Sequence, residues 1–185
     1  MKDRILRRSP QEVQAREKRN LNFREARIVV NRFKTELAAQ GSNGILYIED
    51  DEVWMPPRYA REGEKRPFSA KGKEITLLWD LRPCEPSITN RGGWESKRID
   101  VGVLDDGEII VSFSTPNGTG FSQKQWLEES PRYLQLLAIR KKAAASREDQ
   151  SEEGEAITLE PSLEDRIRYA MEFAQYVSDG RYTRD

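Results

Sequence analysis

The sequence predicts an α+β fold, in which N-terminal and C-terminal helices pack on a mainly antiparallel sheet of about four or five strands. The centre of the sheet is a hairpin at residues 98–113. Ile99, Val101 and Val103 alternate with other residues, Asp106-Gly107 supplies a turn, and a second β-branched run follows. The other strand candidates are too close together in the sequence for the helical crossovers that parallel pairing requires. Antiparallel pairing is therefore expected throughout.

The N-terminal part of the chain is predicted to contain two helices. Ser9-Pro10-Gln11-Glu12 has the pattern of a capping box and begins a helix that ends at about Arg19. This helix has no apolar stripe, so it needs a partner surface or a continuation. A second start signal at Asn22 begins a helix that ends at Gly41. Its core face follows three- and four-residue steps through Phe23, Ala26, Val30, Phe33 and Leu37.

Strands are predicted between Gly41 and the central hairpin. Residues 45–48 and 53–55 flank four acids and suggest another hairpin, which Pro56-Pro57 closes. Residues 58–73 are predicted to form a polar loop. The most apolar strand candidate is EITLLWDL, residues 74–81, and an irregular stretch follows it.

The C-terminal part is predicted to contain two main helices joined by an acidic linker. Ser130-Pro131 begins an almost continuously apolar helix, which should bury more than one side. Ser162 caps the last helix, and Gly180 ends it. We expect a basic arm (1–21), a core domain (22–145), a linker (146–161) and a C-terminal amphipathic helix with its tail (162–185).

Composition excludes several classes of function. The chain contains no histidine, which rules out Ser-His-Asp and Cys-His catalysis and His-ligated zinc. Cys84 is the only cysteine, so no intrachain disulfide forms and the chain is expected to be intracellular. No apolar run approaches the ~20 residues that span a bilayer. We predict no cofactor, no metal, no membrane partner, and a location in the cytoplasm or in a particle assembled inside the cell.

The charges are segregated along the chain. Residues 1–34 contain eleven basic and four acidic residues, whereas the whole chain has a net charge of −1. We predict contact with nucleic acid or an acidic partner through the basic residues of this segment, with a solvated basic face as the alternative. They are Arg4, Arg7, Arg8, Arg16, Lys18, Arg19, Arg24, Arg27 and Lys34.

Trp94, between Gly93 and Glu95, is expected to be exposed and to serve as a protein-interface anchor, since Trp dominates binding energy at many interfaces. The last helix has an apolar face wider than one docking surface requires. Met171, Phe173 and Tyr176 are therefore also predicted to lie at a protein interface.

The leading hypothesis is a non-enzymatic structural or interaction subunit of a larger assembly, such as a viral particle or a multisubunit machine. It rests on the charged fraction of 34% and the hydrophobic fraction of 36%, which suggest a small core with a large polar periphery. The partners would be other protein subunits or copies of this chain, whose acidic residues 148–165 complement the basic N-terminus.

Two alternatives remain open. One is a nucleic-acid-associated accessory protein that uses the basic N-terminal segment on phosphates. The other is a metal-dependent nuclease-like enzyme that uses Asp80 after an apolar strand and the Glu95-Ser96-Lys97 triplet. Such triplets arise easily by chance, and Asn90-Arg91-Gly92-Gly93 replaces the apolar strand that should precede Glu95.

Overall fold

The computed structural model confirms the predicted α+β class. It describes residues 9–54, 69–85, 93–116, 120–121, 126–127, 130–148 and 161–181. The helices are α1 (Pro10–Ala39), α3 (Pro131–Glu148) and α4 (Leu163–Ser178). The strands are β1 (Ile45–Trp54), β2 (Ser69–Cys84), β3 (Gly93–Leu104), β4 (Ile109–Ser114) and β5 (Gly120–Phe121).

The strands form one antiparallel sheet in the order β1-β2-β3-β4-β5. The predicted central hairpin is confirmed as β3 and β4, in which Val101 pairs with Val111. Gly107 in its turn has a φ of +88°, a conformation that side chains with a Cβ rarely adopt. The carboxylate of Asp106 accepts a hydrogen bond from the backbone N–H of Glu108 (2.8 Å) and closes the turn.

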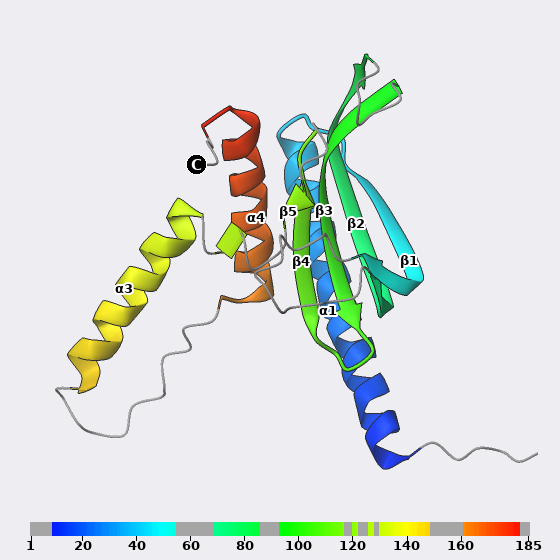
Figure 1. Cartoon of the computed structure of the whole chain (residues 1–185), viewed down its shortest axis with the longest axis vertical. Helices are drawn as coiled ribbons and strands as arrows, with labels where there is room; N and C mark the ends of the chain where they lie inside the picture. The colour runs from blue at the N-terminus through cyan, green and yellow to red at the C-terminus, as the bar shows by residue number, and fades with distance from the viewer. Residues whose placement is uncertain are drawn as a thin grey trace, which may run out of the picture.

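Helices α1 and α4 cover one face of the sheet and form the core with it (Figure 1). The strand residues on this face alternate as the pleat requires, with Leu77 of β2 beside Ile99 of β3 and Phe113 of β4. Phe113 meets Phe173 of α4 edge to face, with ring centroids 5.8 Å apart. Each aromatic or aliphatic side chain buried here contributes about 1.5–3 kcal/mol relative to exposure.

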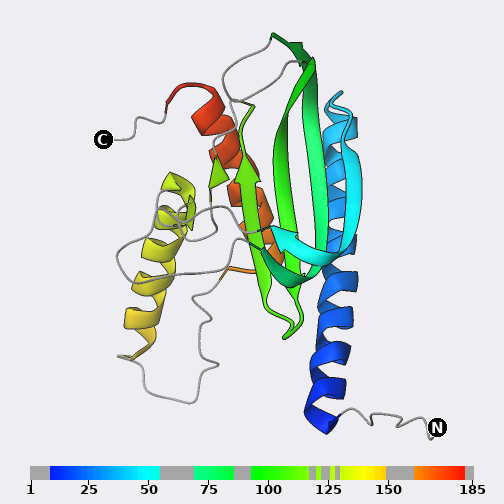
Figure 2. The same cartoon turned by 45° about the vertical axis from the view of Figure 1, so that its right-hand side comes forward.

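The opposite face of the sheet is partly covered by the sheet's own edge strand. Figure 2 shows the end of β1 bending across this face. Val53 is buried there against Gly102, and a Cβ at Gly102 would overlap its side chain. The close approach explains why β3 has a glycine in the middle of its β-branched run.

One helix replaces the two that were predicted before Gly41. The capping box at Ser9 is confirmed, since its Oγ accepts from the N–H of Glu12 and the Glu12 carboxylate accepts from the N–H of Ser9. The predicted break at Asn22 is wrong. The Asn22 side chain donates to the carbonyl of Gly107 (2.7 Å) instead of capping, and the helix continues through it. The expected boundary between residues 21 and 22 therefore lies inside α1.

Other predicted boundaries are also wrong. The four acids do not form a hairpin loop, because β1 runs through them as one edge strand, and Lys73 neutralises Asp50 (2.9 Å). Strand β2 begins at Ser69, inside the predicted loop, and ends at Cys84, inside the predicted irregular stretch. Residues 146–148, assigned to the acidic linker, are the last residues of α3. Residues 55–68, 86–92 and 149–160 lie outside the described part of the chain.

Helix α3 lies beside α4 on the side away from the sheet (Figure 1). Arg132 pairs with Glu172 of α4 (2.5 Å), and the rings of Tyr133 and Tyr169 lie 5.9 Å apart. The expectation that α3 buries more than one side is wrong, because Leu134 and Ile139 are exposed. Only its flank toward α4 has a partner in the described structure, which leaves these aliphatic side chains in water.

Candidate interaction surface

The first turns of α1 project beyond the end of the sheet (Figures 1 and 2). Three contacts with the β3–β4 turn hold this part of the helix in place. The guanidinium of Arg19 pairs with Asp105, and Asn22 donates to Gly107. The aliphatic part of Lys18 packs against Gly107, where no side chain intervenes. The β3–β4 turn therefore fixes the position of this part of α1, which otherwise extends into solvent.

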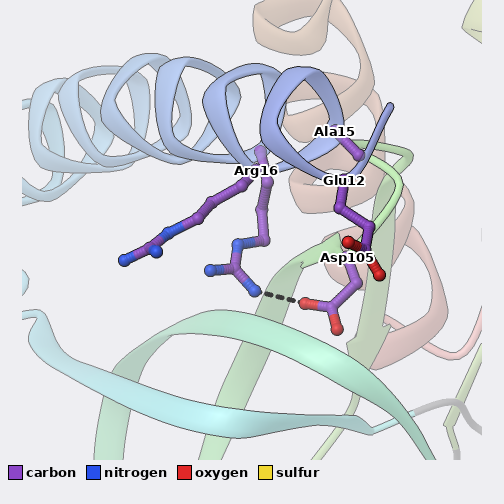
Figure 3. A pocket seen from close by; sticks show the side chains of 5 residues that line it. Glu12, Ala15, Arg16 and Asp105 are labelled. Atoms are coloured by element: carbon purple, nitrogen blue, oxygen red, sulfur yellow. Dashed lines mark hydrogen bonds and ion pairs between the residues drawn. The ribbon is translucent and has the colours of Figure 1, made fainter. Parts of the chain in front are cut away.

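An open depression of about 490 Å³ lies between this part of α1 and the β3–β4 turn. It is lined by Glu12, Ala15, Arg16, Arg19 and Asp105 (Figure 3). Figure 3 shows the Arg16 side chain reaching from α1 without a dashed contact, whereas Arg19 is held by Asp105. Two acidic and two basic residues line this depression, so it has no net charge that would select an anion or a cation.

Arg16, Arg24 and Arg27 are exposed and have no ion-pair partner in the described structure. Every other arginine whose side chain is described has a carboxylate or carbonyl partner. These are Arg19, Arg32, Arg82, Arg98, Arg132, Arg140, Arg166, Arg168 and Arg181. The unpaired arginines are therefore not a random sample of the surface, since all lie on one helix.

The positions around these arginines explain their lack of partners. Residues three or four positions away are neighbours on a helix surface. None of the residues at these distances from Arg24 or Arg27 is acidic, and the same holds for Lys34. Glu12, four residues before Arg16, is instead hydrogen-bonded to the N–H of Ser9 (2.7 Å). We name Arg16, Arg24, Arg27 and Lys34 the basic flank of α1.

The structure separates the predicted contact residues into groups. Arg19 is occupied by Asp105, and Lys18 is exposed at its charged end. Lys34 is half-buried near Gly44 and has no ion-pair partner in the described structure. Arg4, Arg7 and Arg8 lie outside the described residues. Only part of the predicted set is therefore brought together on one exposed surface.

Besides Val13, which is 42% exposed, helix α1 carries two strongly exposed aliphatic residues whose exposure the sequence pattern did not predict. Leu21 is 64% exposed and Ile28 is 62% exposed. They are seven residues apart, a spacing that returns to the same helix face. Their position outside the stripe from Phe23 to Leu37 was the signal in the sequence.

Trp94 is 65% exposed, as expected. It lies on β3 opposite Pro83 of β2, beyond an irregularity between Trp79 and Arg82. This end of the β2–β3 pair rises above the helices in Figures 1 and 2. Beside it, Arg82 is paired with Glu95 across the two strands. Strand pairing fixes the backbone of Trp94 and leaves its indole exposed.

The prediction that Phe173 of α4 lies at a protein interface is wrong, because this residue is buried in the chain's own core. Tyr176 stacks on it with centroids 6.0 Å apart, and Met171 also packs partly against the core. The wide apolar face of α4 has a structural explanation. The helix contacts the sheet, α1 and α3, so it needs more than one apolar side.

Lys97 and Asp80 form a polar network where β2, β3 and α4 meet. The Lys97 ammonium donates to Asp80 (2.7 Å) and to the side-chain carbonyl of Gln175. Asp80 is the one described non-glycine residue with positive φ, +52°, and Ser42 donates to it (2.9 Å). Burial raises its pKa, but hydrogen bonds from Lys97 and Ser42 and the charges of Lys97 and Arg82 outweigh this and lower the pKa below 3.8.

A second polar network lies on the opposite face of the sheet. Arg98 donates to both carboxylate oxygens of Asp100 (2.7 and 2.8 Å), and Thr76 donates to the same carboxylate (2.6 Å). Arg98 also reaches Glu74 (3.5 Å). Asp100 is almost fully buried, and this desolvation raises its pKa above 3.8 despite Arg98 and Thr76.

The carboxylates of the nuclease-like alternative are each matched with a cation. Asp80 pairs with Lys97, and Glu95 pairs with Arg82. Within the described ranges, no group of three or more His, Cys, Asp or Glu residues is arranged to hold a metal ion. Among the same residues, no helix has both the length and the hydropathy needed to cross a bilayer.

Comparison of the chain with protein-family models, curated proteins and solved structures finds no match. The function must therefore be inferred from the residues of the chain itself. The described surfaces that stand out are the basic flank and outward face of α1, and Trp94 on the β2–β3 pair.

Proposed function

We propose that the protein is a non-enzymatic interaction subunit of a larger assembly and that it docks on another protein subunit through Trp94. The observation that carries the proposal is the exposure of this indole, 65%, on a strand pair whose backbone is hydrogen-bonded. Tryptophan is enriched among residues that dominate interface energy. Strand pairing also fixes the backbone at this position, so binding has to order only the side chain.

The surroundings of Trp94 fit an interface anchor. Pro83 lies across from it in β2, and Arg82 and Glu95 form an exposed ion pair beside it. An apolar ring with a polar rim is the usual composition of a binding centre. Exposed aliphatic residues elsewhere support further contacts in an assembly: Leu21, Ile28, Leu134 and Ile139.

The test compares the tagged full-length chain with its Trp94→Ala variant, and uses Tyr47→Ala as a control. Tyr47 is another exposed aromatic residue, 49% exposed, on β1. Affinity purification from the native cells should yield a stoichiometric partner with the wild type and Tyr47→Ala, but not with Trp94→Ala. Hydroxyl-radical footprinting of the purified complex should show Trp94 protected.

A matched stability measurement keeps this test interpretable. Since Trp94 is mostly exposed, its replacement should change the free energy of unfolding by no more than about 0.5 kcal/mol. If all three proteins retain the same partner, or the wild type sediments from cell extract as a monomer with Trp94 unprotected, the proposal is wrong.

A further inference from the structure

We infer that the basic flank of α1 binds the phosphate backbone of a nucleic acid. This inference concerns a different surface from Trp94 and goes beyond docking on a protein. It begins from the selective absence of ion pairs. Among the arginines whose side chains the structure describes, all have a carboxylate or carbonyl partner except Arg16, Arg24 and Arg27. Arginine is suited to phosphate because its planar guanidinium donates two parallel hydrogen bonds.

The arrangement of the charges fits a linear polyanion. From Arg16 to Lys34 the flank is about 27 Å long, at about 1.5 Å per helical residue. That length corresponds to about eight base pairs, at about 3.4 Å for each phosphate of one strand. Asn20 and Asn31 lie between the cations on the same side of α1, and their amides can donate to phosphate oxygens.

The same features favour a nucleic acid over an acidic protein. Protein interfaces are depleted of charged residues at their centres, whereas nucleic-acid interfaces are polar and strongly positive. Exposed Leu21 and Ile28 lie on the far side of Arg24 from Arg27 and Lys34, so they do not form the centre of the flank. On the neighbouring strand β1, Asp50 is already neutralised by Lys73 (2.9 Å).

The fold keeps the flank accessible. The buried face of α1 is set by Ala26, Val30 and Phe33, and the ion pair between Arg32 and Glu164 (2.6 Å) fixes the side toward α4. The basic flank is on the other side of the helix. Arg16, Arg24 and Arg27 are therefore exposed, Lys34 is half-buried, and α4 neutralises none of the four.

The test measures the binding of a fluorescent 20-base-pair DNA duplex and of single-stranded RNA by fluorescence anisotropy, at several salt concentrations. The variant replaces Arg16, Arg24 and Arg27 together with glutamine, a good helix former. The control replaces Arg32, Arg132 and Arg181 with glutamine. These arginines have side chains 52%, 61% and 70% exposed, and their loss gives the same change in net charge.

For wild type we expect binding that weakens steeply between about 50 and 200 mM salt, because neutralised phosphates release counterions. The α1 variant should lower the slope of log K against log salt by about 3 and weaken binding at least tenfold at about 50 mM salt. The control should change the affinity by less than about twofold, since its arginines are already paired with acids.

Three results would overturn the inference. One is the absence of salt-dependent binding by wild type at low salt. Another is an equal loss of binding in the α1 variant and the control, which would mean that only net charge matters. The third is displacement of the duplex by poly-glutamate as effectively as by unlabelled DNA at equal total charge, which would assign the flank to an acidic protein.

Discussion

Individual residues of the sheet show how the two faces differ. Most residues on the helix-covered face are apolar, and Lys97 at one end of this face is satisfied by Asp80 and Gln175. On the other face Asp100 is buried with Thr76 and Arg98. A buried charge is tolerated only when it is paired and hydrogen-bonded, and both sites meet this condition. The Lys97–Asp80 and Arg98–Asp100 networks are best explained by a role in stabilising the fold.

Asp100 should make the stability of the protein depend on pH. Because burial raises its pKa in the folded state above 3.8, folding favours the protonated carboxyl. The favourable contribution is full below the unfolded pKa and is lost as pH rises through the folded pKa. Relative to Asp100→Asn, wild type should therefore be most stable at acidic pH and lose this advantage as pH rises.

Urea unfolding of both proteins at a series of pH values measures this difference. Asp80→Asn should give a stability difference with the opposite pH dependence. The pKa of Asp80 is lowered in the folded state, so its contribution to stability is lost as pH falls. A stability difference between wild type and Asp100→Asn that does not change from acidic to neutral pH would contradict the assignment.

At the scale of single elements, α1 combines two unlike halves. Its C-terminal half is fixed by the buried residues Ala26, Val30 and Phe33, whereas in the described structure its N-terminal half depends on Arg19 and Asn22 at the β3–β4 turn. Helical stability in proteins comes mostly from packing of an apolar face. The two halves should therefore open with different free energies.

Hydrogen exchange of the Arg19→Gln/Asn22→Ala double variant tests this division. Amides of residues 13–20 should exchange about tenfold faster than in wild type, which corresponds to a loss of about 1.4 kcal/mol in local opening. Amides of residues 26–37 should keep their protection. Equal acceleration along the whole of α1 would show that the helix opens as one unit.

Other elements show what the sequence could and could not predict. The central hairpin was predictable because β-branched alternation and an Asp-Gly turn occur within a few residues. The edge strand β1 was not, because four consecutive acids resemble a turn unless the pairing of Asp50 with Lys73 is known. The same limit applies to the continuation of α1 through Asn22, whose partner Gly107 is 85 residues away.

The members of the basic flank also could not be identified from the sequence alone. Arg19 and Arg32 look like Arg16 and Arg27 in the sequence, but their partners Asp105 and Glu164 lie 86 and 132 residues away. Charge patterning could therefore predict a basic surface on this helix, but only the fold shows which cations are already neutralised. Trp94 was easier to anticipate, since its neighbours offer nothing apolar to cover it.

At the scale of the whole molecule, the C-terminal helix belongs to the core and is not an arm. Phe173 of α4 meets Phe113 of β4, and Ile167 is fully buried in the same cluster as Phe33 of α1. The first predicted helix, which has no apolar stripe, was expected to need a partner surface or a continuation. It has the continuation, because α1 extends to Ala39.

Phe173→Ala should destabilise the whole fold by about 3–5 kcal/mol, because it empties a site shared by the sheet and α4. Chemical unfolding followed by far-UV and near-UV circular dichroism should give coincident transitions, both shifted to lower denaturant. Met171→Ala, at a half-buried neighbouring position, should shift them less. If the near-UV transition stayed in place while helix was lost separately, α4 would be an independent element.

The bend at the end of β1 also affects how molecules of this chain meet at high concentration. An edge strand with free backbone groups is a template for another strand, and stacking of such edges leads to fibrils. Here Val53 seats the end of the strand over Gly102, so the edge curves away from the plane in which a second strand would add. A larger residue at position 102 would displace the end of β1 outward and leave a straighter edge. Gly102 should therefore lower the tendency of this edge to aggregate.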